Sequence, residues 1–221
     1  DFCLSRGLGD VYKRQMIILC LHHRIAVQMV QEALPKIPAG TILVDTCGLK
    51  GRMVRDLTYR CQKAGVRYVG THPMAGREKN GYYASIPNLF QNANLIVTPV
   101  DGTDEAALDT VKELAKQMGF GKIVTATPMW HDNMIAYTSQ LAHVVSSSYV
   151  KDFCMDDALS FSGGSFQDMT RVATMDESMW ALLFLDNRDN LLYHLDLLIE
   201  NLTDYRDALK QRDEERLQYL I

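Results

Sequence analysis

The chain has 221 residues, of which 47% are hydrophobic and 23% are charged, and its formal net charge is −4 at pH 7. This composition indicates a folded globular protein with enough material for one large or two small cores, and it argues against disorder. No run of Lys or Arg offers a surface for nucleic acid or an anionic membrane. The early apolar run Met16 to Leu21 is far shorter than the roughly 20 residues that cross a bilayer. The function classes that remain are chemistry on small molecules and association with other proteins.

The cysteines predict a reducing, cytoplasmic location. There are five, an odd number, without a CxxC pair or a spacing typical of metal ligands: Cys3, Cys20, Cys47, Cys61 and Cys154. This pattern argues against a disulfide framework, and we expect no metal site.

Residues 1–15, DFCLSRGLGDVYKRQ, show no periodicity that leads into the strand after them. The stretch SRGLGDVYKRQ is typical of translated adapter sequence, so we interpret residues 1–15 as a non-native leader and leave them out of the fold prediction. A short irregular N-terminal arm is the alternative.

Short apolar strands alternate with helices over residues 16–127. Strands are expected at 16–21, 41–45, 66–70, 94–99 and 122–126, and helices at 25–34, 53–64 and 104–118. Gly65 and Gly119 follow two of these helices, as C-terminal cap glycines do. Nearly continuous apolar strands favour a mostly parallel sheet that is covered on both faces, so we predict a partial Rossmann-like α/β domain.

Helix signals replace strand signals after Pro128, so we expect a domain boundary near residue 127 and a helical domain over 128–221. Near its end, six apolar residues are spaced 4, 3, 4, 3 and 4 apart: Leu191, Leu195, Leu198, Leu202, Tyr205 and Leu209. This spacing makes a narrow apolar seam on one helix face. A helix that faces the core of its own subunit and a dimer interface explain the seam equally well.

Three segments carry residues suited to catalysis or binding. In Thr71 to Gly81, THPMAGREKNG, a His-Pro step directly after a strand precedes two glycines, which makes His72 a candidate base. In the first helix after Pro128, His131, Ser139 and His143 fall within about 120° of one another at 100° per residue. In residues 162–180, the guanidinium of Arg171 needs a carboxylate, from a ligand or from the chain itself. Structural roles for these residues remain alternatives.

From Met16 to the C-terminus, these segments resemble the prephenate dehydrogenase family. HPMAG with Glu78, Lys79 and Gly81 resembles its signature loop; His131-Asp132, Ser139 and His143 resemble its first helical-domain segment. A third group of residues resembles another segment of that domain: Phe166, Asp168, Thr170, Arg171 and Trp180. Several motifs in consistent order are harder to obtain by chance than one.

The resemblance implies oxidative decarboxylation of prephenate to 4-hydroxyphenylpyruvate in tyrosine biosynthesis, with NAD favoured over NADP. It implies that His72, with a pKa near the working pH, accepts the proton of the ring hydroxyl. Arg171 would bind a substrate carboxylate and His143 would line the pocket, with Glu78, His131 and Ser139 contributing to the substrate site. It places Leu21, Thr46 and Gly48 at the cofactor, and it implies a cytoplasmic homodimer formed through the C-terminal helices.

The chain departs from the family pattern in several places. Gly48 replaces a serine that many members carry, Gln140 stands where members often show a second histidine, and His22-His23 stand where an aromatic-Pro step is common. No G-x-G-x-x-G follows a strand, so we expect the first βαβ unit to be missing and this chain to bind cofactor weakly and turn over barely or not at all.

Three other functions remain open at this point. One is a dehydrogenase of the same kind that acts on the related substrate arogenate. A dehydrogenase for another small hydroxy acid would normally carry a catalytic lysine on the helix after the sheet, but Asn133 to Val145 contains none. A dimerising remnant without turnover is the non-enzymatic alternative.

Overall fold

The computed structural model describes residues 15–76 and 82–221. By internal contacts the chain divides into two compact units, the first ending at Asp132 and the second running from Asn133 to Ile221. The division falls inside helix α5 (Pro128–Ile135), a few residues after the boundary expected near 127.

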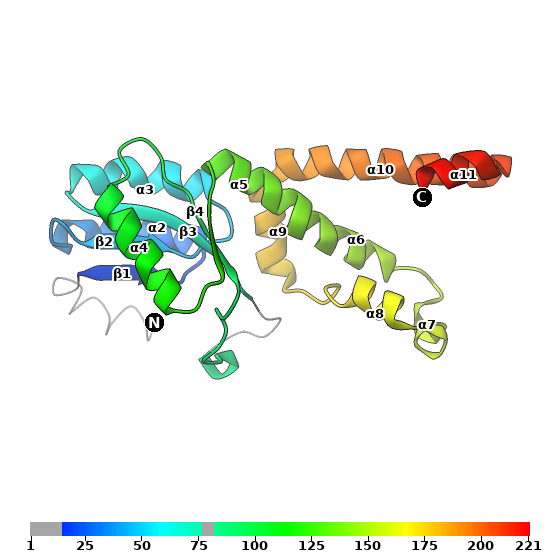
Figure 1. Ribbon diagram of the computed structural model, residues 1–221, viewed down its shortest axis with the longest axis horizontal. Helices are drawn as coiled ribbons and strands as arrows, with labels where there is room; N and C mark the ends of the chain where they lie inside the picture. Colours follow the sequence, from blue (N-terminus) through cyan, green and yellow to red (C-terminus); the bar gives the residue numbers. More distant parts are fainter. Residues whose placement is uncertain (1–14, 77–81) are drawn as a thin grey trace. The chain divides into compact units, whose positions relative to one another are not determined.

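A five-stranded sheet forms the centre of the first unit (Figure 1). Its strands lie in chain order: β1 (Met16–Leu19), β2 (Ile42–Asp45), β3 (Arg67–Met74), β4 (Asn94–Val97) and β5 (Lys122–Thr125). The β1–β2, β2–β3 and β4–β5 pairs are parallel, and the β3–β4 pair is antiparallel. The predicted mostly parallel α/β sheet is therefore confirmed.

Strand β3 is longer than the sequence predicts. We expected it to end at Gly70 with the His-Pro step in a following loop, but β3 continues to Met74, and His72 and Pro73 pair with β4. That expectation was wrong because proline normally marks the end of a strand. Pairing with β2 ends at Gly70, so beyond it β3 has β4 alone as a described neighbour, and a proline without an N–H is tolerated there.

Helices cover both faces of this sheet, as the sequence predicts. Helices α2 (His23–Ala33) and α3 (Gly51–Lys63) pack on one face, where their apolar residues share a core with Leu43 of β2. Helix α4 (Glu105–Gln117) packs on the other, with Val44 and Val69. The predicted cap glycines adopt positive φ, +71° at Gly65 and +88° at Gly119, conformations that glycine adopts without steric cost. The described residues of this unit also form two 3₁₀ turns, η2 (Leu34–Lys36) and η3 (Tyr82–Ala84).

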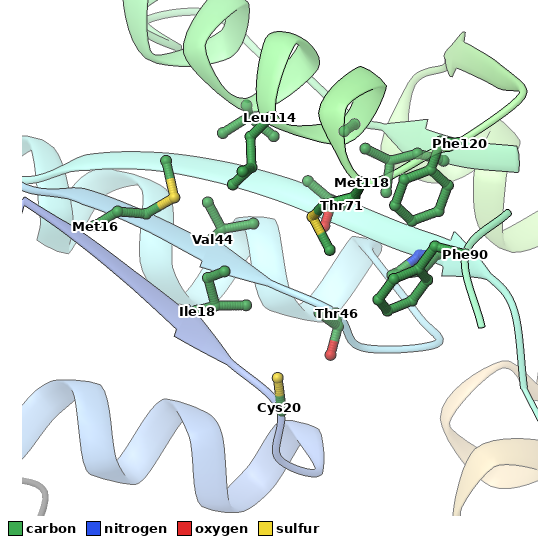
Figure 2. Close-up of a pocket in the computed structure, with 14 residues that line it drawn as sticks. Met16, Ile18, Cys20, Val44, Thr46, Thr71, Phe90, Leu114, Met118 and Phe120 are labelled. Atoms are coloured by element: carbon green, nitrogen blue, oxygen red, sulfur yellow. The ribbon is translucent and has the colours of Figure 1, made fainter. Parts of the chain in front are cut away.

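An apolar pocket of about 220 Å³ lies on the α4 face of the sheet (Figure 2). Met16 and Ile18 of β1 line it from the sheet, and Leu114 and Met118 line it from the α4 side. The side chain of Ile18 is 47% exposed, although it belongs to a strand whose apolar pattern predicts burial. Helix α4 therefore leaves part of this face uncovered within the described residues.

The second unit is helical. After α5 come a π-helical segment (Ala136–Gln140) and α6 (Leu141–Tyr149), followed by α7 (Met155–Phe161), α8 (Gly164–Thr170), α9 (Glu177–Asp186), α10 (Arg188–Gln211) and α11 (Glu214–Leu220). Its core joins Ala136 and Leu141 to Leu191 of α10. No helix in the described ranges is long and apolar enough to cross a membrane.

The predicted apolar seam on α10 is buried near the start of the helix and largely exposed farther along it. Leu191, Leu195 and Leu198 pack into the core of the second unit. Farther along the same helix, Leu202 and Leu209 are 57% and 62% exposed. The part near the start of α10 is thus explained within the chain, and farther along Tyr205 bonds to the carbonyl of Leu220 of α11. The exposure of Leu202 and Leu209 is not explained within the described residues.

Candidate active site

A buried ion pair supports the loop that follows β2. Lys50 is completely buried, and its ammonium group donates to the carboxylate of Asp45 and, at 2.6 Å, to the carbonyl of Thr71. The other carboxylate oxygen of Asp45 accepts from the hydroxyl of Tyr68 at 2.7 Å. A buried charge is tolerated only with such partners, so this network fixes the loop from Thr46 to Lys50 against β3.

Three side chains form a chain of hydrogen bonds beside this loop. Nδ1 of His72 lies 2.8 Å from Nε2 of His131, and Nδ1 of His131 lies 2.7 Å from Oδ1 of Asp132. His131 is only 1% exposed, whereas His72 is partly exposed. The sequence singled out both histidines separately, and the structure brings them together from positions 59 residues apart.

Asp132 is held by the first turn of α3. Its Oδ1 accepts from the backbone N–H of Lys50 at 2.7 Å, and its Oδ2 accepts from that of Gly51 at 2.8 Å. Lys50 is the N-cap residue of α3 and makes no cap bond with its own side chain. Asp132 thus satisfies amide groups that a helix N-terminus leaves without an intrahelical partner, and the helix dipole favours its negative charge there.

The surroundings of His72 keep its ring neutral. Burial, the neighbouring His131 and the charge of Lys50, in that order of size, together lower the pKa of His72 from its ordinary value of 6.5 to about 3. The expectation of a pKa near the working pH was wrong because a strand position among buried groups replaces the open loop that we expected. At neutral pH His72 is an uncharged hydrogen-bonding ring.

The proposed cofactor residues lie at the carboxyl ends of β1 and β2, the edge where parallel α/β sheets bind ligands. Thr46 donates to the carbonyl of Leu19 at 3.2 Å, and the thiol of Cys47 donates to that of Leu21 at 3.2 Å. A Cβ added to Gly48 would lie 4.0 Å from Nε2 of His72, its nearest neighbour. Gly48 therefore leaves open space in front of the ring nitrogen that does not bond to His131.

One buried atom at this edge fits a bound group. Nε2 of His22, directly after Leu21, is buried and makes no hydrogen bond. Buried polar atoms usually have a partner, so this nitrogen fits a polar ligand at the end of β1. A nicotinamide group, flat with one polar amide, suits these surroundings. Within residues 15–76 and 82–221, no strand is followed by the glycine-rich turn that would hold its phosphates.

The remaining predicted site residues belong to the second unit. His143 stacks on Trp180 with ring centroids 3.8 Å apart and donates through Nδ1 to the carbonyl of Ser139 at 2.9 Å. Arg171 directly follows α8 and is exposed. The prediction that one regular helix face carries His131, Ser139 and His143 assumed 100° per residue, and the π-helical segment interrupts that period. Glu78 lies outside the described residues.

Sequence reasoning did not select Lys50 or assign a role to Asp132. The contacts that give Lys50 and Asp132 their roles include residues distant in sequence, namely Thr71 for Lys50 and the backbone of Lys50 and Gly51 for Asp132. The signal for Asp132 was its place beside His131. Gln140, noted only as a departure, is buried and bonds through its amide to the carbonyl of Leu183 at 3.1 Å and to the side chain of Asn187 at 2.8 Å, which gives it a structural role.

Comparison with known families gives matches over almost the whole chain. A family model described as the nucleotide-binding domain of prephenate dehydrogenase matches residues 2–125, and one described as its dimerization domain matches residues 127–221.

Individual relatives are similar in the same way. A prephenate dehydrogenase of Bacillus subtilis is 32% identical over 80% of this chain and 48% of its own length, so the chain spans about half of that relative. A cyclohexadienyl dehydrogenase of Zymomonas mobilis is 29% identical over 98% of this chain and 78% of its own length. The crystal structure of prephenate dehydrogenase from A. aeolicus with hydroxyphenyl propionate and NAD+ superposes with a TM-score of 0.81, at 26% identity, over 98% of this chain and 77% of that one.

Proposed function

Because the chain belongs to the prephenate dehydrogenase family, we propose that the protein containing it oxidises prephenate to 4-hydroxyphenylpyruvate with loss of carbon dioxide. The observation that carries the proposal is the position of His72. One of its ring nitrogens is bonded to the buried His131, and the other faces the open space at Gly48. The lone pair on Nε2 of this neutral ring can accept a proton from a bound hydroxyl group, although its lowered pKa makes it a weaker base in the resting protein than an exposed imidazole.

The proton of the ring hydroxyl passes to Nε2 of His72. The O–H bond breaks and the C–H bond of the same carbon releases hydride, so a carbonyl forms there. The bond to the ring carboxylate then breaks with release of carbon dioxide, and its electron pair makes the ring an aromatic phenolate, which takes up a proton. The low pKa of His72 leaves the nitrogen unprotonated at neutral pH, so its lone pair is available. The surrounding buried groups exclude water from the inner side of the ring.

The cofactor in this proposal is NAD, which is bound in the A. aeolicus structure. Leu21, Thr46 and Gly48 would hold its nicotinamide end, with His22 as an additional polar contact. When bound, the nicotinamide supplies an acceptor for the hydride that leaves the ring carbon.

The substrate's carboxylates require cationic or polar partners. We assign one carboxylate to Arg171, whose planar guanidinium can bind it through two hydrogen bonds. His143 and Ser139 contribute to the wall of the substrate site, and the Trp180 ring fixes the orientation of His143. Glu78 and His131 complete the proposed polar surroundings.

A homodimer through the C-terminal helices is part of the proposal. The matching family model is described as a dimerization domain, and the distal face of α10 exposes Leu202 and Leu209. Exposed leucines in series on one helix are typical of a surface that another helix covers. The cysteines at 20, 47, 61 and 154 are free thiols, which supports the proposed cytoplasmic location.

The domain division is proposed as residues 16–127 for the partial dinucleotide-binding domain and 128–221 for the helical domain. The partly uncovered α4 face of the sheet, with Ile18 exposed, supports the idea that a further βα unit packs there in the complete domain. The phosphate-binding turn would belong to that unit.

The test is a product assay with the protein encoded by the complete gene. Supplied with NAD and prephenate, it is expected to form reduced cofactor, carbon dioxide and 4-hydroxyphenylpyruvate in equal amounts. A parallel assay with arogenate shows which of the two related compounds is the substrate. If cofactor is reduced with arogenate but not with prephenate, the substrate is arogenate. If cofactor is reduced with neither, the proposed activity is rejected.

A further inference from the structure

We propose that Asp132 is a positioning residue which, through His131, holds His72 in the tautomer whose Nε2 carries no proton. The inference rests on the proposed function, since it assumes that Nε2 of His72 is the proton acceptor. It adds a role for Asp132, a residue to which the sequence analysis gave no function.

The direction of the hydrogen bonds begins at the carboxylate. The backbone N–H groups of Lys50 and Gly51 both donate to Asp132, and a carboxylate that accepts these bonds has only lone pairs to offer His131. Nδ1 of His131 lies 2.7 Å from Oδ1 of Asp132, too close for two lone pairs to face each other. Nδ1 of His131 therefore carries a hydrogen and donates it.

The same reasoning passes to the next ring. A neutral His131 with a hydrogen on Nδ1 has a lone pair on Nε2, which lies 2.8 Å from Nδ1 of His72. Nδ1 of His72 must then donate, which leaves Nε2 of His72 without a hydrogen. The alternative is a His131 with hydrogens on both ring nitrogens that donates to Nδ1 of His72, which would put the hydrogen of His72 on Nε2. The position of that hydrogen therefore distinguishes the two arrangements.

The hydrogen-bonded series Asp132, His131 and His72, here called the relay, also accounts for the proton after its transfer. When the substrate O–H bond breaks, the proton binds Nε2 of His72, and the hydrogen on Nδ1 of His72 can pass to Nε2 of His131. His72 then ends neutral with its hydrogen on Nε2, and the positive charge resides on His131, 2.7 Å from the carboxylate of Asp132. Atoms and charge balance within these three side chains and the substrate.

Gly51 is necessary for this arrangement. A Cβ at Gly51 would lie 2.8 Å from Oδ2 of Asp132, closer than side-chain carbons come to oxygen. Gly51 lies in the first turn of α3, where alanine would ordinarily stabilise a helix relative to glycine. An alanine here would instead displace the carboxylate of Asp132 without changing the identity of Asp132, His131 or His72.

The tautomer can be measured on this chain without any turnover. In ¹⁵N NMR spectra of the histidine-labelled chain at neutral pH, we expect an unprotonated Nε2 and a protonated Nδ1 at His72. The same pattern is expected at His131. Substitution of each histidine by asparagine in turn assigns the signals. A hydrogen on Nε2 of His72 in the unmodified chain would overturn the proposal.

Turnover in the complete protein gives a second, separate test. Asp132→Asn and Gly51→Ala should each lower kcat by about 10- to 100-fold, a part of the 10²- to 10⁴-fold that a general base contributes, with KM little changed. Asp104→Ala is the matched control for a lost helix cap, because Asp104 accepts from the N–H of Ala107 at the start of α4. Gly164→Ala is the control for the glycine change, since no atom lies within 4 Å of the added Cβ.

The outcomes separate this inference from the proposed function. If prephenate is oxidised but kcat in Asp132→Asn and Gly51→Ala equals that of the controls, the relay is structural and the proposed function stands. If the tautomers are as expected but prephenate is neither bound nor oxidised, the proposed function fails while the hydrogen-bond geometry holds. Should the variants fold poorly, the tautomer measurement on the unmodified chain still decides.

Discussion

Gly48 faces the outer ring nitrogen of His72, and a Cβ built on it would lie 4.0 Å from that Nε2 atom. We predict that Gly48→Ser folds with a free energy of unfolding within about 0.5 kcal/mol of the original, because nothing blocks the added side chain. Its hydroxyl should lower the KM for substrate by up to about tenfold, the value of one added hydrogen bond.

Denaturant unfolding and steady-state kinetics measure both effects of Gly48→Ser. Gly119→Ser is its control for a strained position, because φ there is +88° and the Gln91 side chain occupies the Cβ direction. That variant should lose stability. A higher KM in Gly48→Ser would show that substrate needs the space that the glycine leaves.

The low pKa of His72 predicts how stability depends on pH. In the unfolded chain a histidine takes up a proton near its ordinary pKa of 6.5, whereas His72 in the folded protein does so at about 3. Between these values the unfolded state binds more protons, so the free energy of unfolding falls as pH is lowered. The stability that the neutral His72 ring contributes is fully present only above pH 6.5.

Urea unfolding between pH 4 and 8 tests this dependence. The slope of stability against pH should be smaller in His72→Asn than in the original chain at acidic pH, and the two slopes should agree above pH 7. Equal slopes over the whole range would mean that His72 titrates alike in the folded and unfolded chain.

Arg171 is predicted to bind a substrate carboxylate through two hydrogen bonds. Arg171→Lys keeps the charge and loses the planar fork, at a cost of about 1.5–3 kcal/mol, so KM should rise about 10- to 150-fold with stability unchanged. Arg188→Lys is the matched control, because Arg188 pairs with Asp189 on an exposed surface of α10. If Arg171→Lys unfolds more easily and its folded fraction binds substrate normally, Arg171 has a structural role.

The distal part of α10 is predicted to be a dimer interface. Leu202→Glu with Leu209→Glu places charges on two side chains that are 57% and 62% exposed within the chain, so the folded subunit should tolerate them. Sedimentation velocity should show a dimer for the original chain and a monomer for the double variant. Asn201→Glu, also exposed on α10, is the control. A double variant that remains dimeric would place the interface elsewhere.

The sequence predicted most of the sheet and its helices because apolar spacing and cap glycines directly reflect local structure. Gly65 and Gly119 mark helix ends at the positions expected, with the positive φ values that glycine permits. Two local features carry no such signal. Pro73 lies inside β3 because it pairs with β4 there, and the π-helical segment at 136–140 changes the helical period without a distinctive residue.

The site was harder to predict because its contacts connect distant parts of the chain. His72 and His131 were chosen separately, and their 2.8 Å hydrogen bond depends on how β3 and α5 are placed by the fold. Lys50 follows no motif, and its ammonium group is buried only because Asp45 and Thr71 converge on it. Residue type and spacing can therefore nominate a base, but its pKa depends on these tertiary neighbours.

The most direct measurement is the turnover of the complete protein with prephenate and NAD after His72→Asn, with His131→Asn and His143→Asn made in parallel. Loss of a general base should reduce kcat of His72→Asn by about 10²- to 10⁴-fold while the dissociation constant for prephenate stays the same. His131→Asn should lower kcat less, and His143→Asn should chiefly weaken binding. Full turnover in His72→Asn, or a larger fall in kcat at His131 or His143 than at His72, would contradict the assignment of His72 as the proton acceptor.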